Sequence, residues 1–330
     1  ISVALVWIVI SMCGALPFVL CGDIPGYSDA LFETISGFTT TGSSILPDVE
    51  ALTHASLFWR SFTHWVGGMG VIVFVLAILP MRRRRMGSQM HMMRAESPGP
   101  VVGKLVPKVR DTAMILYKIY FGMTVTEIIL LLLAGMPLFD SLCLSFGTAG
   151  TGGFGVLADS IASYPLLQQG IITVFMILFG VNFNVYYLLV RGRFREAFRS
   201  EEVRVYWLIV LFAVVLLTLN AYFGYYLPLL QGSGLHVTAA EEEHVFFYTL
   251  RNSFFMTASL VTSTGFGTVD TTLWPQFSQV IMLLLMTVGA CAGSTGGGLK
   301  VSRIILLVKE AGNELHILIH PNAVRSVHLE

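Results

Sequence analysis

The sequence predicts an all-α integral membrane protein, in which units of helix, re-entrant pore loop and helix repeat around a central pore. Apolar side chains make up 55% of the 330 residues and charged ones only 12%, whereas soluble chains average about 25% charged residues. Two further observations support this prediction: long apolar segments recur along the chain, and the connections between them alternate in charge. A soluble globular protein is excluded, because it would need more polar surface.

Six apolar segments are long enough to cross a bilayer, which takes about 20 helical residues. The last segment is too long for one plain helix, and the run from Gly289 to Gly298, with five glycines, interrupts it because glycine disfavours helix. The chain begins at Ile1 without methionine or a basic leader, so we expect a fragment of a longer protein and no signal peptide. The six segments cover residues 2–20, 57–79, 113–133, 171–190, 205–223 and 277–308.

The connections between these segments alternate in charge. Lysine and arginine gather in the second and fourth connections and after residue 299, as Arg82, Arg83, Arg84, Arg85, Arg94, Lys104, Lys108, Arg110, Arg191, Arg193, Arg195, Arg199, Arg204, Lys300, Arg303, Lys309 and Arg325. Residues 21–56, 135–169 and 228–244 contain none, but carry Asp23, Asp29, Glu33, Asp48, Asp140, Asp159 and Glu241 to Glu243. Because basic loops stay in the cytoplasm, we expect a multi-pass protein of the cell inner (plasma) membrane with the acidic connections outside.

Each external connection contains or is followed by a short half-polar segment that ends in Thr-Gly. Residues 32–42 and 255–265 share Phe, Thr, Ser, Thr, Thr and the final Gly at matching positions, and residues 142–152 share the final Thr-Gly. A repeated pattern of this kind indicates a repeated structural unit. We therefore divide the chain into a first pore repeat (1–80), a cytoplasmic basic linker (81–110), a second repeat (111–200), a third repeat (201–310, with the glycine-rich break at 289–298) and a cytoplasmic or interfacial tail (311–330).

These Thr-Gly segments are too short and too polar to cross the membrane, so we expect them to dip in and return. Glycine permits backbone angles that turn successive carbonyl oxygens toward a common axis, and a ring of carbonyls can replace the hydration shell of a cation. The preceding helices would point their negative ends at the same place. The alternative is that each glycine is an ordinary helix C-cap, but three occurrences in corresponding places favour the first interpretation.

Other chemistries are not supported. Residues 150–155 match the dinucleotide-binding pattern GxGxxG, but no strand precedes them and no acidic residue follows at the spacing needed to bind a ribose. Residues 293–300 resemble a phosphate-binding loop, but the lysine comes one position late. The four cysteines form no CxxC pair. We expect no enzyme, no cofactor and no nucleic-acid partner. We interpret His64 as a packing or interface residue, and Arg60 and Asn182 as hydrogen-bond partners between helices.

Several stretches resemble the Trk/Ktr/HKT superfamily of potassium transporters, and most closely its TrkH-type bacterial members. They are residues 32–44, 65–70, 94–100, 262–266, 289–300 and 320–324, and Gly293-Ser-Thr-Gly-Gly-Gly-Leu-Lys300 is the most specific of them. The resemblance implies four repeats around one pore, potassium as the transported ion, a homodimer, and a cytosolic nucleotide-binding subunit that regulates it. We expect potassium uptake through a filter of backbone carbonyls.

The resemblance also implies which residues line the filter and which form the gate. A glycine at position 42, rather than serine, goes with potassium instead of sodium in relatives. The break at 289–298 resembles an intramembrane gating loop, although a simple helix kink is an alternative, and Arg303 is expected to repel cations, to anchor the loop or to reach the interface. The filter residues are Thr40, Thr41, Gly42, Gly150, Thr151, Gly152, Ser263, Thr264 and Gly265; the gate residues are Gly289, Gly293, Ser294, Thr295, Gly296, Gly297, Gly298, Lys300 and Arg303.

The sequence departs from the family pattern at both ends. No fourth Thr-Gly segment follows Gly298, and the two spans that precede the first repeat in TrkH-type members are missing, so we expect a truncated chain with three of four pore repeats. A coupled secondary transporter, linked to sodium or protons and acting on another cation or a small solute, is the alternative function. Broken helices suit such a transporter, but its repeats are usually inverted, whereas these share one orientation.

Overall fold

The computed structural model describes residues 2–70, 109–231 and 239–319. Within these ranges every regular element is a helix, and strand pairing is limited to two isolated bridges, Leu157 with Ser160 and Val288 with Leu299. The prediction of an all-α fold is confirmed. The basic cluster at 82–85, the end of the apolar segment at 57–79 and the motif at 320–324 lie outside the described residues.

The first repeat consists of two helices that form a span, one short helix and one returning helix. The predicted span at 2–20 is made by α1 (Ser2–Gly14) and α2 (Leu16–Cys21), and α4 (His54–Gly68) returns. Between them, α3 (Tyr27–Phe38) has 12 residues. At about 1.5 Å per residue it is too short to cross a hydrocarbon core of about 30 Å. The chain therefore enters and leaves on the same side, as predicted for a re-entrant segment.

The second repeat follows the same order. It begins with α7 (Val109–Leu133), continues with the short α8 (Leu138–Gly150) and returns through α9 (Leu166–Phe179). Two further helices, α10 (Phe183–Val190) and α11 (Phe194–Arg199), lie beyond α9.

The predicted span at residues 171–190 is sharply bent and is not one straight helix. Helices α9 and α10 meet at an angle of 92°. The helix ends at Gly180, and Asn182 starts a new one because its side-chain oxygen accepts a hydrogen bond from the backbone N–H of Asn184 at 3.0 Å. An asparagine in this capping role favours a helix start over helix continuation. Apolar composition alone did not reveal the bend.

The third repeat differs from the other two in the length of its helices. Its first span is 31 residues long, because α12 (Glu201–Ala221) continues through a π-helical turn into α13 (Leu227–Gln231). The expected short re-entrant segment at 255–265 is the end of a 23-residue helix, α14 (Ala239–Val261). After it come α15 (Gln276–Thr287) and α16 (Val301–Ile319), and the predicted glycine-rich break separates them.

Three helices are long and apolar enough to cross a membrane among the described residues, or four if the bent pair is one span. They correspond to the predicted spans at 2–20, 113–133 and 205–223, with the bent pair at 171–190 as the fourth. The sixth predicted span is divided by the break, and α15 by itself is a short apolar helix of 12 residues. On α12, Leu208, Leu211 and Phe212 are each more than 60% exposed, as expected for side chains that face lipid.

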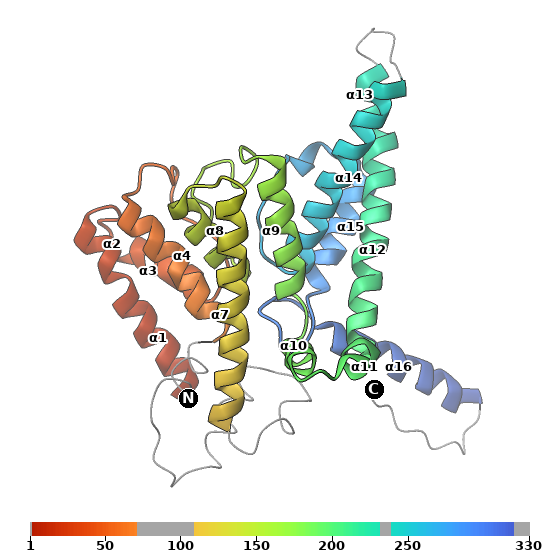
Figure 1. Ribbon diagram of the computed structural model, residues 1–330, viewed down its shortest axis with the longest axis horizontal. Coiled ribbons are helices and arrows are strands. Elements are labelled where there is room, and N and C mark those ends of the chain that lie inside the picture. Colours follow the sequence, from red (N-terminus) through yellow and green to blue (C-terminus); the bar gives the residue numbers. More distant parts are fainter. Residues whose placement is uncertain (1, 71–108, 232–238, 320–330) are drawn as a thin grey trace.

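The long helices stand side by side, and α10, α11 and α16 lie at the lower end of the bundle, the same end at which α1 and α7 begin (Figure 1). The short helices α3 and α8 occupy the upper half. Helix α4 packs along both α3 and α8, while α14 packs against α9 and α12. The arginines of α11 therefore lie at the opposite end of the molecule from the loops that follow α3 and α8.

Candidate ion-conducting site

The three Thr-Gly segments share one backbone geometry. In each, a non-glycine residue with positive φ is followed two positions later by a glycine with positive φ: Thr40 (54°) and Gly42 (76°), Thr151 (53°) and Gly153 (78°), Ser263 (57°) and Gly265 (86°). Positive φ is uncommon outside glycine, so three copies of this pair in corresponding places indicate one repeated turn. We call residues 39–42, 150–153 and 262–265 the first, second and third turns.

Backbone hydrogen bonds give the same alignment of the turns. The N–H of Thr41, Gly152 and Thr264 each donates to the carbonyl five residues earlier, at 2.9, 3.0 and 2.8 Å. Our sequence alignment placed Gly152 with Gly42. The structure shifts the second turn by one residue, so that Gly153 is equivalent to Gly42 and Gly265. The shift was missed because the second segment contains two consecutive glycines after its threonine, and composition does not distinguish between them.

The turns contact one another in chain order. A Cβ on Gly42 would lie 2.0 Å from the carbonyl oxygen of Gly152, and a Cβ on Gly153 would lie 2.0 Å from the carbonyl oxygen of Thr264. Gly152 and Thr264 occupy the same position of their turns. The same glycine-to-carbonyl contact therefore joins the first turn to the second and the second to the third, which is the arrangement expected around an axis.

The second turn differs from the other two in its side chains. In the first and third turns a pair of threonine hydroxyls is hydrogen-bonded, Thr39 with Thr41 at 2.8 Å and Thr262 with Thr264 at 2.7 Å. The corresponding residues of the second turn are Gly150 and Gly152, which have no side chain to pair. A residue from another helix fills this space instead.

That residue is His64 of α4, which is fully buried. A Cβ on Gly152 would lie 2.3 Å from its Nδ1, and a Cβ on Gly150 would lie 2.3 Å from its backbone oxygen. Its ring stacks on Phe154, with centroids 4.0 Å apart. Neither ring nitrogen finds a hydrogen-bond partner among the described residues. His64 is a packing residue, as the sequence suggested, and the structure adds that it packs directly behind the second turn.

Helix α4 also contacts the second turn and the end of α3, just before the first turn, through small residues. A Cβ on Gly67 would lie 2.0 Å from the carbonyl oxygen of Phe38, the last residue of α3, and a Cβ on Gly68 would lie 2.5 Å from the Cα of Gly150. Backbones approach this closely only where side chains are absent. One helix thus fixes the relative positions of two turns.

A buried ion pair supports the segments that leave the first and second turns. Arg60 Nε lies 2.5 Å from Glu33 Oε1, and both side chains are at most 4% exposed. Glu33 also accepts hydrogen bonds from the hydroxyl of Ser44 and the N–H of Ile45, after the first turn. Arg60 donates to the carbonyl oxygen of Gly155, after the second turn, at 3.1 Å. The prediction that Arg60 bonds between segments agrees with these contacts.

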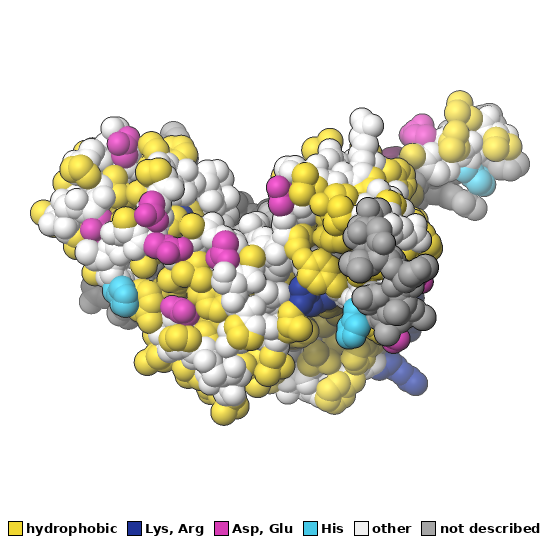
Figure 2. Space-filling model, turned by 90° about the horizontal axis from the view of Figure 1, so that it is seen from above, with side chains coloured by type: hydrophobic (Ala, Val, Ile, Leu, Met, Phe, Trp, Pro, Cys, Tyr) yellow, Lys and Arg dark blue, Asp and Glu magenta, His cyan; other side chains and the backbone are white. Residues whose placement is uncertain are grey.

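Glu33 does not belong to the exposed acidic surface to which we assigned it. It is 1% exposed, because α3 turns this face toward α4. Other acidic residues of the external connections are exposed, namely Asp29, Asp48, Glu50 and Asp159, and so is Asp270 after the third turn. Figure 2, which looks down on the loops, shows acidic side chains scattered over this face and few basic ones. A surface of this charge attracts cations.

The glycine-rich loop (residues 288–300) lies directly against the second and third turns. The hydroxyl of Thr151 donates to the carbonyl oxygen of Thr295 at 3.0 Å. The N–H of Gly297 donates to the hydroxyl oxygen of Ser263 at 2.6 Å. Within the loop, a Cβ on Gly289 would lie 2.0 Å from the carbonyl oxygen of Gly297, so its two halves fold back on each other. The structure thus brings the two predicted groups of residues together.

The loop is held on its other side by α12 and by the α9–α10 bend. The carboxylate of Glu202 accepts hydrogen bonds from the N–H of Ala292 at 2.6 Å and of Ser302 at 3.2 Å, and from the side chain of Asn182 at 3.2 Å. The bend also bonds the loop through its backbone, with Gly180 oxygen accepting from Cys291 N–H at 3.0 Å. Glu202 was missed, because an acidic residue among arginines is usually solvated.

The predicted gate residues differ in how far they are exposed to solvent. Gly289 and Gly296 are buried, whereas Gly297 and Gly298 are exposed. Lys300 is partly buried and donates a hydrogen bond to the carbonyl oxygen of Gly296. Of the other predicted gate residues, Gly293, Ser294 and Thr295 are partly buried, and Arg303, in the first turn of α16, is exposed.

Helices that end in contacting turns, two of them too short to cross a membrane, with a broken helix packed against the turns, are typical of the class of α-helical pore-loop membrane proteins. Comparison with known proteins assigns the family: residues 1–330 match TrkH, described as a cation transport protein, and the chain belongs to this family.

Relatives and one solved structure agree with this assignment. The chain is 39% identical to the Trk system potassium uptake protein TrkH of Salmonella typhimurium and 38% identical to that of Escherichia coli K12, over 99% of its length. It spans 65% of the length of each of these two relatives. The crystal structure of the potassium transporter TrkH from Vibrio parahaemolyticus superposes with a TM-score of 0.76 at 32% identity, covering 98% of this chain and 63% of that one.

Proposed function

We propose that this protein carries potassium ions into the cell through a passage lined by the backbone carbonyls of the three turns. The observation that carries the proposal is the repeated contact between a glycine of one turn and a carbonyl oxygen of the next, at Gly42 with Gly152 and at Gly153 with Thr264. Such contacts place successive carbonyl groups around a common axis, where they replace water around a dehydrated cation. The names of the relatives, potassium uptake proteins, point the same way.

The proposed filter includes one residue that the sequence alignment left out, Gly153. Its φ of 78° and its contact with Thr264 match those of Gly42. Glycine at position 42 favours potassium over sodium, as the resemblance implies. The full set is Thr40, Thr41, Gly42, Gly150, Thr151, Gly152, Gly153, Ser263, Thr264 and Gly265.

Transport needs no covalent chemistry in this proposal, and therefore no catalytic residue and no cofactor. The exposed acidic residues raise the local cation concentration at the outer mouth. The C-terminal ends of α3, α8 and α14 contribute partial negative charge near the turns. An inside-negative membrane potential then drives entry with about 2.3 kcal/mol per charge per 100 mV.

We also propose that the glycine-rich loop is the gate. It is hydrogen-bonded to Thr151 and Ser263 on one side and to Glu202 on the other, so it lies across the inner end of the proposed passage. Its glycines allow the backbone to change conformation at low steric cost. Lys300 and Arg303 add positive charge on its cytoplasmic side, which opposes cation exit in the closed state.

We further propose which side of the membrane each end of the bundle faces and which partners the protein has. The arginine-bearing end of the bundle is assigned to the cytoplasm and the acidic loops to the outside of the inner membrane. The family resemblance favours a homodimer regulated by a cytosolic nucleotide-binding subunit, which would dock on the cytoplasmic end.

Rubidium uptake into lipid vesicles containing the protein at its full encoded length tests the proposal. We expect potassium to inhibit rubidium uptake more strongly than sodium does. We also expect a membrane potential, imposed by a potassium gradient, to drive the uptake when no sodium or proton gradient is present. Absence of rubidium flux would overturn the proposal. Uptake that stops when the sodium or proton gradient is collapsed would replace it with the coupled transporter.

A further inference from the structure

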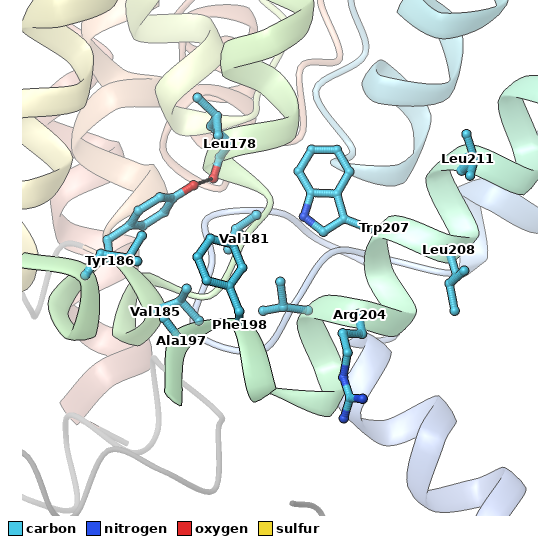
Figure 3. A pocket seen from close by; sticks show the side chains of 12 residues that line it. Leu178, Val181, Val185, Tyr186, Ala197, Phe198, Arg204, Trp207, Leu208 and Leu211 are labelled. Atoms are coloured by element: carbon cyan, nitrogen blue, oxygen red, sulfur yellow. Dashed lines mark hydrogen bonds between the residues drawn. The ribbon is translucent and has the colours of Figure 1, made fainter. Parts of the chain in front are cut away.

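An apolar pocket of about 530 Å³ opens between the α9–α10 bend and the start of α12. Figure 3 shows Val181, Val185 and Tyr186 on one side and Trp207 and Leu208 on the other, with Phe198 of α11 between them. Its volume lies within the range of about 300–1,000 Å³ that is usual for small-molecule sites. The pocket is separate from the three turns and the glycine-rich loop.

The lining side chains are apolar and open to the outside of the bundle. Phe198 is 71% exposed, Leu208 63% and Trp207 45%. The hydroxyl of Tyr186, a polar group at the wall, is already used, because it donates to the carbonyl oxygen of Leu178 at 2.6 Å. The pocket therefore suits a hydrocarbon occupant, and it lies on the surface of a membrane protein, where acyl chains are the available hydrocarbon.

One end of the pocket is positively charged. Arg204 belongs to the lining, and in Figure 3 its guanidinium points away from the apolar side chains, toward the lower end of the molecule. The neighbouring exposed arginines are Arg191, Arg193, Arg195 and Arg199. The surrounding carboxylates are engaged elsewhere: Glu196 pairs with Arg193, Glu201 with Lys309, and Glu202 is buried against the glycine-rich loop.

An apolar pocket with an exposed arginine at one end matches an amphipathic anion. The hydrocarbon part fits between α9, α10 and α12, and the anionic part meets Arg204 where a cytoplasmic headgroup lies. Basic side chains at this depth attract anionic lipids. A zwitterionic lipid fits the apolar part equally well, so charge is what distinguishes the occupant.

We propose that this pocket binds one acyl chain of an anionic phospholipid of the cytoplasmic leaflet, with the lipid phosphate against Arg204. The site adjoins the bend whose Gly180 and Asn182 hold the glycine-rich loop. This proposal concerns lipid binding and does not depend on which ion the protein carries.

Fluorescence quenching of Trp207 by brominated lipids tests it. A variant of the full-length protein in which every other tryptophan is replaced by phenylalanine, among residues 1–330 Trp7, Trp59, Trp65 and Trp274, keeps Trp207 as the single tryptophan. In mixed vesicles, we expect brominated phosphatidylglycerol to quench Trp207 with about five-fold higher relative affinity than brominated phosphatidylcholine, the effect of one arginine near the membrane surface. Arg204→Gln should reduce this ratio to about one, and Val185→Phe should do the same by filling the pocket.

The matched control is Arg195→Gln, which removes an exposed arginine of α11 that does not line the pocket; it should leave the ratio unchanged. Equal quenching by both lipids in the parent protein would overturn the proposal, and so would an equal loss in the Arg195 variant. No quenching by either lipid would also overturn it, since a second copy or another segment would then cover the pocket. If the single-tryptophan variant fails to fold, mass spectrometry of phospholipids retained through purification gives the same comparison, with anionic lipid expected on the unmodified protein and lost in Arg204→Gln.

Discussion

The hydroxyl of Thr151 donates a hydrogen bond to the carbonyl oxygen of Thr295, at 3.0 Å, although the two residues are 144 positions apart. The first belongs to the second turn and the second to the glycine-rich loop. The contact ties the second turn to the loop, because the Thr151 hydroxyl, which also lies 2.7 Å from the carbonyl oxygen of Gly150, would lose one of its two acceptors if the two segments moved apart.

The glycine alignment found in the structure predicts which positions tolerate a side chain. Gly153→Ala and Gly42→Ala should both abolish rubidium uptake, because each new Cβ would lie 2.0 Å from a backbone carbonyl oxygen of the next turn. Gly135→Ala is the control: this glycine also has positive φ, but nothing lies within 4 Å of the new Cβ. It should cost about 1–2 kcal/mol of stability and retain uptake. Normal uptake by the Gly153 variant would refute the one-residue shift.

Glu202→Gln should weaken the attachment of the glycine-rich loop to α12. A hydrogen bond to a charged group is worth about 1.5–3 kcal/mol, so we expect the open population, and with it rubidium uptake, to rise about ten-fold or more. The control is Glu201→Gln. Glu201 forms a partly exposed ion pair with Lys309, so this substitution should leave uptake within about two-fold of the parent. Equal effects of the two substitutions would contradict an anchoring role for Glu202.

Arg60→Met should destabilise the protein by about 3–5 kcal/mol, because it leaves the carboxylate of Glu33 buried without its cation. The double variant Glu33→Gln with Arg60→Met should be more stable than Arg60→Met alone, since no unpaired charge remains. Thermal unfolding in detergent measures both. The exposed pair Arg193–Glu196 is the comparison, and Arg193→Met should cost at most about 1 kcal/mol. A double variant no more stable than the single one would argue against a charge penalty.

His64→Ala should reduce the preference for potassium over sodium by about ten-fold, because the cavity behind Gly150 and Gly152 lets the second turn relax. His64→Phe keeps an aromatic ring on Phe154 and should retain most of the selectivity. Competition of rubidium uptake by sodium measures the preference. If phenylalanine proves as harmful as alanine, the role of His64 is chemical and not one of packing.

Some features of the fold follow from local sequence. The free energy of transferring a segment into lipid is nearly the sum of the contributions of its side chains. Composition was therefore enough to locate the spans at 2–20, 113–133 and 205–223. Glycine content likewise located the break between α15 and α16. The bend at Gly180 was not found, because its cause is a single capping side chain, Asn182, within an apolar run.

The site shows the same division. Two of the three turns were placed in register by threonines that recur at fixed spacing, and these threonines form the hydroxyl pairs of the first and third turns. The second turn lacks them, and the space beside its two glycines is filled by His64, a residue 88 positions away from Gly152. Glu33 was misplaced for a related reason: its burial depends on the packing of α3 against α4.

The sequence by itself determined that this chain is a helical membrane protein with three glycine turns and a glycine-rich break, because hydrophobicity and backbone freedom are properties of each residue and its near neighbours. Only the tertiary structure decided that Gly153 is the equivalent of Gly42, that His64 supports the second turn, and that Glu202 holds the loop. These depend on steric fit and hydrogen bonding between segments far apart in the chain, which composition and spacing do not encode.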